Sequence, residues 1–311
     1  MHPDATGIAV ANASFAEGAE RIVFLMTEID KDSRAVGLPL VAKHSLYKQK
    51  QSDLKYLRMW HRTFVKTQMK AAKHAVKFNQ RLDNLGVSKG VPRIRFLDCS
   101  VYECTPKPLA ATKRNATAVA EFACLAEKRL NPECYVKWNN NAGAVDGIGR
   151  NNDRQYEDLK VDVVQSKRVV DLGGIEEGDE EEEDDDDDDD DGEGHEDEVG
   201  KTGVVVITPK TEVMELEKRV LEGDIPQAFT HFSYKWTKRD EMVCDIQGEL
   251  NVKQSPAIFE LTDPCIHSYE GRKYGRTDKG YHGVELFFKT HQCNAVCKLL
   301  GIQNRSYEEN S

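Results

Sequence analysis

The sequence has no long apolar run and no feature that would direct it across a membrane. Nowhere among its 311 residues do 18 consecutive apolar residues occur, so a membrane-spanning helix is not expected. No Lys or Arg precedes Arg21, which makes the N-terminal stretch a poor secretory signal. No internal repeat is found, and the composition excludes collagen-like, coiled-coil and wholly disordered proteins. We therefore expect a globular cytoplasmic protein without a membrane partner.

Basic residues are missing from one segment of the chain. Residues 176–198 contain 19 Asp and Glu and no Lys or Arg. This run explains the net charge of −11. Without it, the chain has 43 basic residues and only 35 of its 54 acidic ones, which leaves a positive net charge. Like charges at this density repel one another and bury no apolar surface, so we expect a disordered acidic insert at 146–201 between folded parts at 1–145 and 202–311. It is interpreted as a solvated loop, or alternatively as a segment that binds basic proteins or the chain's own cleft; direct nucleic-acid binding is not expected.

Disulfides are not expected either, although the chain has eight cysteines. In a chain of this size without a secretory signal, cysteines are more often free, metal-bound or catalytic. Two of them lie near a histidine in His291-x-Cys293-x3-Cys297. Cysteines four residues apart share one face of a helix, and a histidine at the helix start can fold over them, which suits a structural, tetrahedral zinc site. The alternative is two buried free cysteines with a surface histidine. A fourth ligand must come from elsewhere, and the candidates are His231, His267 and His282.

The hydrophobic pattern predicts a mixture of helices and strands. Apolar residues recur at steps of three to four over 53–82, which predicts one long helix. Short β-like apolar runs predict strands at 22–28, 39–44, 94–103, 204–208 and 242–246. Further helices are expected at 211–222 and at 284–300, the latter broken near Thr290.

Residues suited to phosphate binding lie near the first two predicted strands. Gly18 precedes the strand at 22–28, and a glycine in such a turn lets backbone N–H groups approach phosphate oxygens. Arg21, next to it, adds charge-assisted hydrogen bonds. Lys43, at the end of an apolar strand, either reaches water or meets a nucleotide phosphate. Taken singly, each feature is also typical of an ordinary turn or strand end.

A second group of polar residues follows the strand predicted at 242–246. Asp245 and Gln247 are two residues apart, so in extended chain they project to the same side. Two oxygen-bearing side chains at a strand end can hold Mg²⁺ and orient a hydroxyl, and Asp263 offers another carboxylate. Each of these residues is also compatible with a plain turn.

Taken together, the motifs occur in a recognisable order over nearly the whole chain. The N-terminal blocks are Phe15-Ala16-x-Gly18-Ala19-x-Arg21, Val41-Ala42-Lys43, Gln68-Met69, Phe78-Asn79 and Tyr135-Val136-Lys137-Trp138-Asn139-Asn140-Asn141-x-Gly143. The C-terminal blocks are Gln227-Ala228-Phe229-Thr230-His231-Phe232-Ser233-Tyr234, Val243-Cys244-Asp245-Ile246-Gln247-Gly248, Leu261-Thr262-Asp263-Pro264-Cys265-Ile266-His267, Gly275-Arg276-Thr277-Asp278-Lys279-Gly280 and Phe287-Phe288-x2-His291-x-Cys293-Asn294-x2-Cys297. This series resembles the alpha-kinase family, the atypical protein kinases that include myosin heavy chain kinases and elongation-factor-2 kinase.

The resemblance implies a two-lobed, atypical protein-kinase-like fold of the α+β class. The N-lobe, with the phosphate loop and the hinge, would occupy 1–145, and the C-lobe, with a structural zinc, would occupy 202–311. The implied activity is transfer of the ATP γ-phosphate to a Ser or Thr hydroxyl of a protein substrate, with ATP, Mg²⁺ and structural Zn²⁺ as cofactors. The alternative is a catalytically inactive pseudokinase that serves as a zinc-stabilised binding or scaffold module.

The resemblance also implies roles for residues at the nucleotide. Gly18 and Arg21 match the phosphate loop of the family. Lys43 matches the lysine that reaches the α- and β-phosphates, and Glu127 matches the hinge glutamate that contacts adenine.

Further roles concern the reaction and the metals. Asp245 matches the catalytic aspartate, while Gln247 and Asp263 match the Mg²⁺ ligands. Gly275 and Gly280 bound the glycine-rich loop that helps to engage a peptide substrate. The implied zinc ligands are His231, His291, Cys293 and Cys297.

Two departures from the family pattern motivate the pseudokinase alternative. Seventeen residues separate Asp245 from Asp263, and the extra segment at 251–259 can shift Asp263 away from the site. Lys70 stands where family members commonly carry an acidic residue. If that acid is the partner of Lys43, its replacement weakens the pair.

Overall fold

The computed structural model describes residues 2–18, 20–46, 54–104, 122–141 and 210–302. The expected strand at 204–208 and the acidic insert lie outside these ranges. No helix in the described ranges combines the length and the apolar character needed to cross a membrane.

A five-stranded antiparallel sheet makes up most of the N-terminal part. Its strand order is β1 (Gly7–Glu17), β2 (Arg21–Ile29), β3 (Ala35–Ser45), β6 (Phe122–Lys128) and β5 (Cys99–Cys104). The strands predicted at 22–28 and 39–44 are confirmed as parts of β2 and β3. β1 was not expected, because it is an edge strand with mostly exposed side chains and so lacks a strong apolar pattern.

A second sheet joins residues from both sides of the insert. Its order is β4 (Arg93–Phe96), β10 (Ile258–Thr262), β9 (Gln247–Asn251) and β7 (Val136–Lys137), with β4 and β10 parallel and the other pairs antiparallel. A separate two-stranded sheet pairs β8 (Glu241–Cys244) with β11 (Cys265–Ser268). The prediction of one β-like run at 94–103 is wrong, because the chain leaves β4 after Phe96 and enters β5, which belongs to the other sheet.

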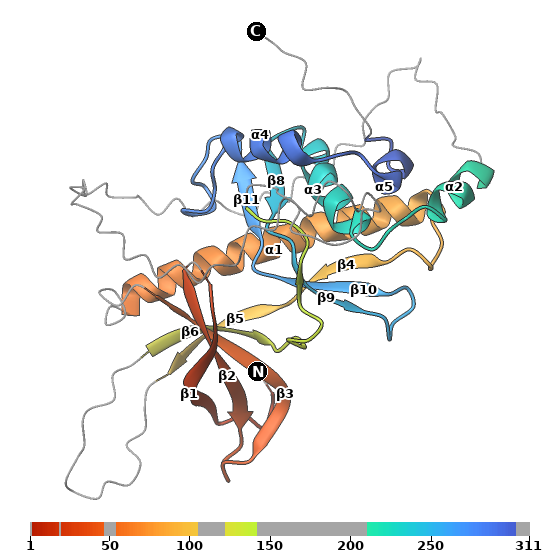
Figure 1. The fold of residues 1–311 in the computed structure, drawn as a ribbon. Helices are drawn as coiled ribbons and strands as arrows, with labels where there is room; N and C mark the ends of the chain where they lie inside the picture. Colours follow the sequence, from red (N-terminus) through yellow and green to blue (C-terminus); the bar gives the residue numbers. More distant parts are fainter. Residues whose placement is uncertain (1, 19, 47–53, 105–121, 142–209, 303–311) are drawn as a thin grey trace, which may run out of the picture. The chain divides into compact units, whose positions relative to one another are not determined.

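The long helix expected at 53–82 is confirmed as α1 (Leu54–Asn84). It packs against β4, β5 and β6 and against α3 (Asp224–Trp236). Figure 1 shows it extending alongside the five-stranded and the four-stranded sheets. Phe78 of α1 meets Phe229 and Phe232 of α3 edge to face, with ring centroids 5.5 and 5.4 Å apart. Fully burying such a side chain stabilises a fold by about 1.5–3 kcal/mol, so this contact anchors α1 to the C-terminal part.

The remaining helices are α2 (Lys210–Glu217), α4 (Tyr281–Thr290) and α5 (Ala295–Leu299). The break expected near Thr290 is confirmed, and α2 ends earlier than the predicted 211–222. α5 begins at Ala295 because the Asn294 side chain accepts hydrogen bonds from the backbone N–H groups of Val296 and Cys297. The expectation that Cys293 and Cys297 share a helix face is therefore wrong, since Cys293 precedes the helix.

Candidate active site

Lys43 of β3 is the cation at the centre of the candidate site. Its side chain is only 5% exposed and pairs with Glu127 of β6. Its Nζ also lies 2.7 Å from Asp263 Oδ2 and 3.0 Å from Thr262 Oγ1. The sheet register places Val41 opposite Glu127, so Lys43 and Glu127 are diagonal neighbours on one face. A buried cation is thus held between two carboxylates, which offset the cost of removing it from water.

Asp263 follows β10 and carries a second cationic partner. An Nη2 nitrogen of Arg21 lies 2.8 Å from Asp263 Oδ1, and the same guanidinium stacks on Phe64 of α1 at 4.0 Å from the ring centroid. Burial acts to raise the pKa of Asp263, but Arg21 and Lys43 together hold it below the ordinary value. Asp263 therefore remains an anion and can serve as an oxygen ligand for a cation.

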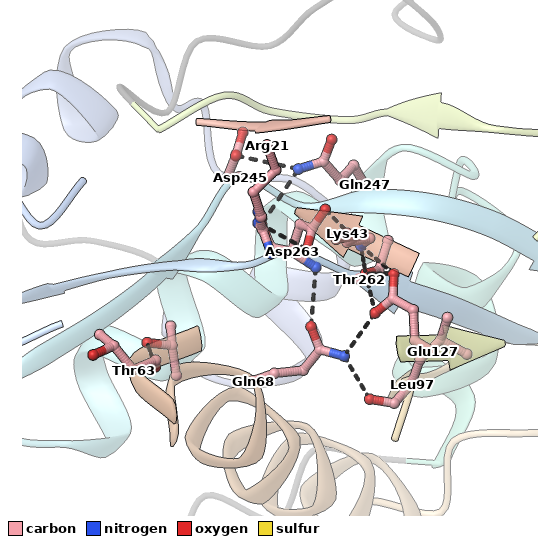
Figure 2. Close-up of polar contacts among 11 residues, drawn as sticks. Arg21, Lys43, Thr63, Gln68, Leu97, Glu127, Asp245, Gln247, Thr262 and Asp263 are labelled. Atoms are coloured by element: carbon pink, nitrogen blue, oxygen red, sulfur yellow. Dashed lines mark hydrogen bonds and ion pairs between the residues drawn. The ribbon is translucent and has the colours of Figure 1, made fainter. Parts of the chain in front are cut away.

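Asp245 lies in the bend between β8 and β9, beside Gln247 (Figure 2). Gln247 Nε2 donates to Asp245 Oδ2 at 3.2 Å and to the Asp263 carbonyl at 3.3 Å. Lys137 of β7 places its Nζ 2.6 Å from Asp245 Oδ1. Burial raises the pKa of Asp245, and Lys137 opposes this shift. Asp245 and Asp263 thus flank Gln247, and Asp245 has the elevated proton affinity that suits a proton acceptor.

Gln68 of α1 ties this cluster together, and its role was not assigned from the sequence. Its amide nitrogen donates to the Leu97 carbonyl at 2.6 Å and to Glu127 Oε2 at 3.3 Å, while its amide oxygen accepts from Asp263 N at 3.1 Å (Figure 2). One side chain therefore fixes the positions of both carboxylates around Lys43. The Gln68-Met69 motif was a clue to it, but the sequence alone does not show which strands meet this helix.

Thr262 and Lys137 were also not singled out as site residues. Thr262 Oγ1 donates to Glu127 and accepts from Lys43, so it bridges the two sheets. Both residues lie within motifs that the sequence displays, but only the fold brings them to Lys43 and Asp245.

Neither departure from the family pattern disturbs the cluster. The residues between Asp245 and Asp263 form the β9–β10 hairpin, which returns Asp263 to Lys43. Lys43 has its carboxylate partners in Glu127 and Asp263, so its pairing does not depend on an acid at position 70. Lys70 instead lies 3.3 Å from Glu241 Oε2, where His74 is also bound at 3.0 Å.

The Glu127 carboxylate is 2% exposed and engaged by Lys43, Thr262 and Gln68. It acts here as the partner of the lysine, and its contact with adenine stays a prediction. A cavity of about 980 Å³ opens beside Glu127 and Lys128, between α1, β4 and β10. Lys43, Asp245 and Asp263 do not line it, so this cavity is not where the phosphate groups would meet those side chains.

The three glycines expected at the site, Gly18, Gly275 and Gly280, lie in turns or loops, and their roles there stay predictions. Gly18 donates its N–H to the Arg21 carbonyl at 2.8 Å and closes the turn between β1 and β2. Gly275 and Gly280 adopt positive φ angles of 88° and 60°, which glycine accepts without strain. A Cβ on Gly280 would lie 3.2 Å from Gly271 Cα, so the loop between these glycines closes tightly at its base.

A candidate metal centre lies where α3 meets the segment joining α4 to α5. The ligand atoms of His231, His291, Cys293 and Cys297 all lie within 4.8 Å of one another. His231 Nδ1 is 3.2 Å from His291 Nε2, and the closest contacts of the two sulfurs with the ring nitrogens are 3.6–3.8 Å. Ligands of a tetrahedral zinc are separated by about 3.3–3.8 Å, so the donor set fits such an ion. Burial lowers the pKa of His231 to about 4, which keeps the imidazole neutral as a ligand must be.

The other two candidate histidines lie elsewhere. His267 is buried with its Nε2 2.7 Å from the Asn141 carbonyl, and its Nδ1 accepts from Lys279 N at 3.1 Å. His282 is exposed beside Glu285, 3.5 Å away. Of the three candidates, the structure therefore brings only His231 to the cluster.

The sheets, the buried Lys43 pair and the neighbouring acidic bends agree with the architecture expected of an atypical kinase domain. The sequence profile of the alpha-kinase family matches residues 16–160 and 209–297. The chain belongs to the alpha-kinase family.

Individual relatives match over a shorter stretch. Alpha-protein kinase 1 of Dictyostelium discoideum is 40% identical over 87 residues, covering 28% of this chain and 6% of the relative. Myosin heavy chain kinase B of the same organism is 37% identical over 83 residues (27% of this chain, 10% of the relative), and eukaryotic elongation factor 2 kinase of Caenorhabditis elegans is 39% identical over 80 residues (25% and 9%). The matched stretch thus spans no more than a tenth of each of these relatives.

Solved structures match over nearly the whole chain. The alpha-kinase domain of myosin heavy chain kinase A in complex with AMP has a TM-score of 0.54 and 22% identity, covering 94% of this chain and 90% of that one. An inactive form of the same domain complexed with ATP gives a TM-score of 0.54 and 21% identity, covering 94% and 88%. This likeness supports the fold.

Proposed function

We propose that this protein is an ATP-dependent Ser/Thr protein kinase. The observation that carries the proposal is the cluster in which Lys43 and Arg21 meet Asp263, with Gln247 and Asp245 beside it. Phosphoryl transfer requires a held nucleotide, neutralised charge and an oriented hydroxyl, and this cluster contains a residue type for each task.

The residues suit ATP and Mg²⁺ as bound groups. Lys43 and Arg21 would hold phosphate oxygens, and the anionic Asp263 with the amide oxygen of Gln247 would hold Mg²⁺. When bound, ATP supplies the phosphoryl group and Mg²⁺ neutralises its charge. Gln68 keeps Asp263 and Glu127 in place around Lys43.

Asp245 would orient the substrate hydroxyl and accept its proton. Its raised pKa and its place between Lys137 and Gln247 suit this role. The hydroxyl oxygen would attack phosphorus while its proton passes to an Asp245 carboxylate oxygen.

The test is phosphate incorporation into a basic carrier protein, followed by intact-protein mass spectrometry with Mg-ATP. We expect transfer by the wild type and a loss of about 10²–10⁴-fold in Asp245→Asn, the range typical of a lost general base. Asn is chosen because, like Asp, it tolerates the left-handed backbone at this position, where φ is 59°.

ATP binding by both proteins serves as the control for folding. If neither protein transfers phosphate while both bind ATP, the kinase proposal fails and the pseudokinase alternative takes its place. Equal transfer by both would remove Asp245 from the mechanism.

We also propose that the His231–His291–Cys293–Cys297 cluster holds a structural zinc. Two thiolates and two imidazoles form a closed donor set, which favours a structural over a catalytic ion. Such an ion would join α3 to the chain between α4 and α5.

Two further parts of the proposal come from the sequence. The acidic run at 176–198 would bind basic proteins or regulate access to the chain's own site through its charge. The protein would act in the cytoplasm on a protein substrate.

A further inference from the structure

Two glutamates face each other on neighbouring strands, one step along the sheet from the candidate site. Glu249 of β9 is the register partner of Glu260 of β10. The next pair on the same face, two residues along each strand, is Gln247 with Thr262. Like charges directly opposite one another destabilise a sheet unless other groups compensate them. The contacts of the two carboxylates therefore show what this pair is used for.

Glu260 links the second sheet to the end of β6. Its side chain is 1% exposed and pairs with Arg95 of β4 and with Lys128, the last residue of β6. Lys128 Nζ lies 2.7 Å from Glu260 Oε2. Burial acts to raise the pKa of Glu260, but Lys128 and Arg95 hold it below the ordinary value. Glu260 is therefore a buried anion that fixes the end of β6 on the face of the second sheet.

Glu249 holds the turn that follows β6. Its Oε2 accepts a hydrogen bond from Asn131 N at 2.7 Å. Asn131 in turn shapes the turn, because its carbonyl accepts from Cys134 N and its Oδ1 from Glu133 N, both at 3.1 Å. We call residues 129–135, which run from β6 to β7, the crossing segment. The two facing glutamates thus bind the start and the middle of one continuous stretch of chain.

The crossing segment connects two ion pairs of the candidate site. It begins just after Glu127, the partner of Lys43, and it leads into β7, where Lys137 pairs with Asp245. Burial raises the pKa of Tyr135, the last residue of the segment, and the carboxylates of the site add to this shift. The Tyr135 hydroxyl therefore lies within electrostatic reach of those carboxylates, and the segment borders the space between the two ion pairs.

The middle of the crossing segment has little else to hold it. Residues 131–135 are exposed, whereas Arg129 donates its N–H to the Pro39 carbonyl of β3 at 2.9 Å. Among the described residues, Glu249 is the only one outside 130–135 that hydrogen-bonds to this stretch. The position of the middle of the segment therefore depends on one carboxylate.

We propose that Glu249 is a positioning residue that holds the crossing segment in place as a wall of the nucleotide site. This proposal rests on the proposed kinase function and adds a residue to which the sequence assigned no role. Glu249 would not touch ATP but would act through Asn131, while Glu260 fixes the start of the segment through Lys128. Without the bond to Asn131, the wall would move and nucleotide would bind less tightly, although the side chains that perform the reaction stay where they are.

The test measures kcat, the KM for ATP and the Kd of Mg-ADP, the last by isothermal titration calorimetry, on the full chain. Glu249→Ala removes the acceptor for Asn131 N–H, whereas Glu249→Gln keeps a carbonyl oxygen there and removes only the charge. Glu222→Ala, which removes an exposed carboxylate before α3, is the matched control. Thermal unfolding of each variant checks the fold, and Glu249→Ala should keep its midpoint because it also removes the repulsion from Glu260.

We expect Glu249→Ala to raise the KM for ATP and the Kd of Mg-ADP by about tenfold, as for one lost hydrogen bond to a charged group, with a much smaller change in kcat. Glu249→Gln should stay within about threefold of the wild type, because a neutral hydrogen bond remains. Unchanged nucleotide affinity in Glu249→Ala would overturn the inference. An equal loss in Glu249→Gln, or a fall in kcat at unchanged KM, would overturn it as well.

The two proposals fail in different ways. Weaker Mg-ADP binding by Glu249→Ala, with no phosphate transfer by any of the proteins, would support the positioning role and reject the kinase function. Phosphate transfer by all of them with the wild-type KM for ATP would leave the kinase function intact and reject the positioning role.

Discussion

Both aspartates of the candidate site occupy backbone conformations that few residues adopt. Asp245 has a φ of 59° and Asp263 a φ of 53°, in the left-handed region. Asp and Asn tolerate this region better than other residues with a side chain, and strained positions of this kind cluster at functional sites. The first bend turns the Asp245 carboxylate toward Gln247, and the second turns the Asp263 carboxylate toward Lys43 and Arg21 while its backbone carbonyl accepts from Gln247. A β-branched residue at either position would disfavour the left-handed backbone and so would not form these bends.

The ionisation of Asp245 should set the acidic limit of activity. Because burial raises the pKa of Asp245 above its ordinary value and Lys137 opposes that shift, Lys137→Met should move the acidic limb of the kcat/KM profile to higher pH. Activity requires the carboxylate, so it is present above this pKa and lost as pH falls through it. The measurement is kcat/KM against pH for both proteins. An unchanged limb would mean that Lys137 does not tune the group that limits the rate.

Gly248 should be irreplaceable because of its neighbour on β10. A Cβ at this position would lie 2.0 Å from the Glu260 carbonyl, and φ is 151°. We expect Gly248→Ala to prevent folding or to lower the free energy of unfolding by more than about 3 kcal/mol, a loss that only a severe clash produces.

Gly86 provides the matched control for this substitution. Its φ is 70°, but no atom lies within 4 Å of the place that a Cβ would take, so Gly86→Ala should cost only about 1–2 kcal/mol from backbone strain. Urea unfolding of both variants measures the difference. Similar losses of stability for the two variants would show that β9 and β10 do not approach closely enough at Gly248 to exclude a Cβ.

At the scale of elements, the candidate metal cluster draws its ligands from α3, the end of α4 and α5. His231 lies on α3, His291 ends α4 and Cys297 lies in α5, a helix of five residues. A helix this short is not stable by itself, so an ion would fix its position. We expect about one zinc per folded chain and loss of α5 packing on chelation.

Elemental analysis of the purified chain measures the metal directly. Cys297→Ser should lower the zinc content and the midpoint of thermal unfolding, whereas Cys134→Ser, an exposed cysteine outside the cluster, should change neither. If the wild-type protein keeps its unfolding midpoint after its metal has been removed, the proposed site is refuted.

The elements that the sequence predicted well are those with one apolar face. α1 shows a helical period because one side packs and the other is charged, and the break after Thr290 is marked by a capping Asn. α3 was not predicted, and burial does not follow polarity along it, because polar residues such as Gln227, Thr230 and Ser233 are buried together with its apolar ones. Short strands at 93–96 and 99–104 were merged because the pattern does not reveal a change of sheet.

The sequence indicated which residues to expect at the candidate site, but it did not indicate which of them contact one another. The resemblance pointed to Lys43, Asp245 and Asp263 as residues, yet pairing of Lys43 with Glu127 depends on the register of β3 and β6. The central position of Gln68 depends on how α1 crosses those strands. These are long-range arrangements, which local sequence patterns do not encode.

At the scale of the molecule, charge is divided unevenly along the chain. The run at 176–198 reverses the sign of the net charge, which is otherwise positive. Deleting this run should abolish binding to histones at low salt, because surface attraction of this kind depends on net charge and is screened by ions. Binding is measured by co-sedimentation with histones on beads.

A chain in which 176–198 is replaced by Gly and Ser of equal length is the control for loop length. It should behave like the deletion, while ATP binding stays at the wild-type level in both. Undiminished histone binding by either chain would locate the attraction outside the acidic run.

Residues on the two sides of 142–209 are joined by their own contacts. β4 pairs with β10, β7 pairs with β9, and Asn139 bonds to Thr230 and Ile246. The continuity of the peptide chain through 142–209 is therefore not what holds the site together. Two separately made fragments, ending before 142 and beginning at 210, should reassemble into one domain. This stretch is therefore a natural point for splitting the protein into a reporter pair or for fusing another domain into it.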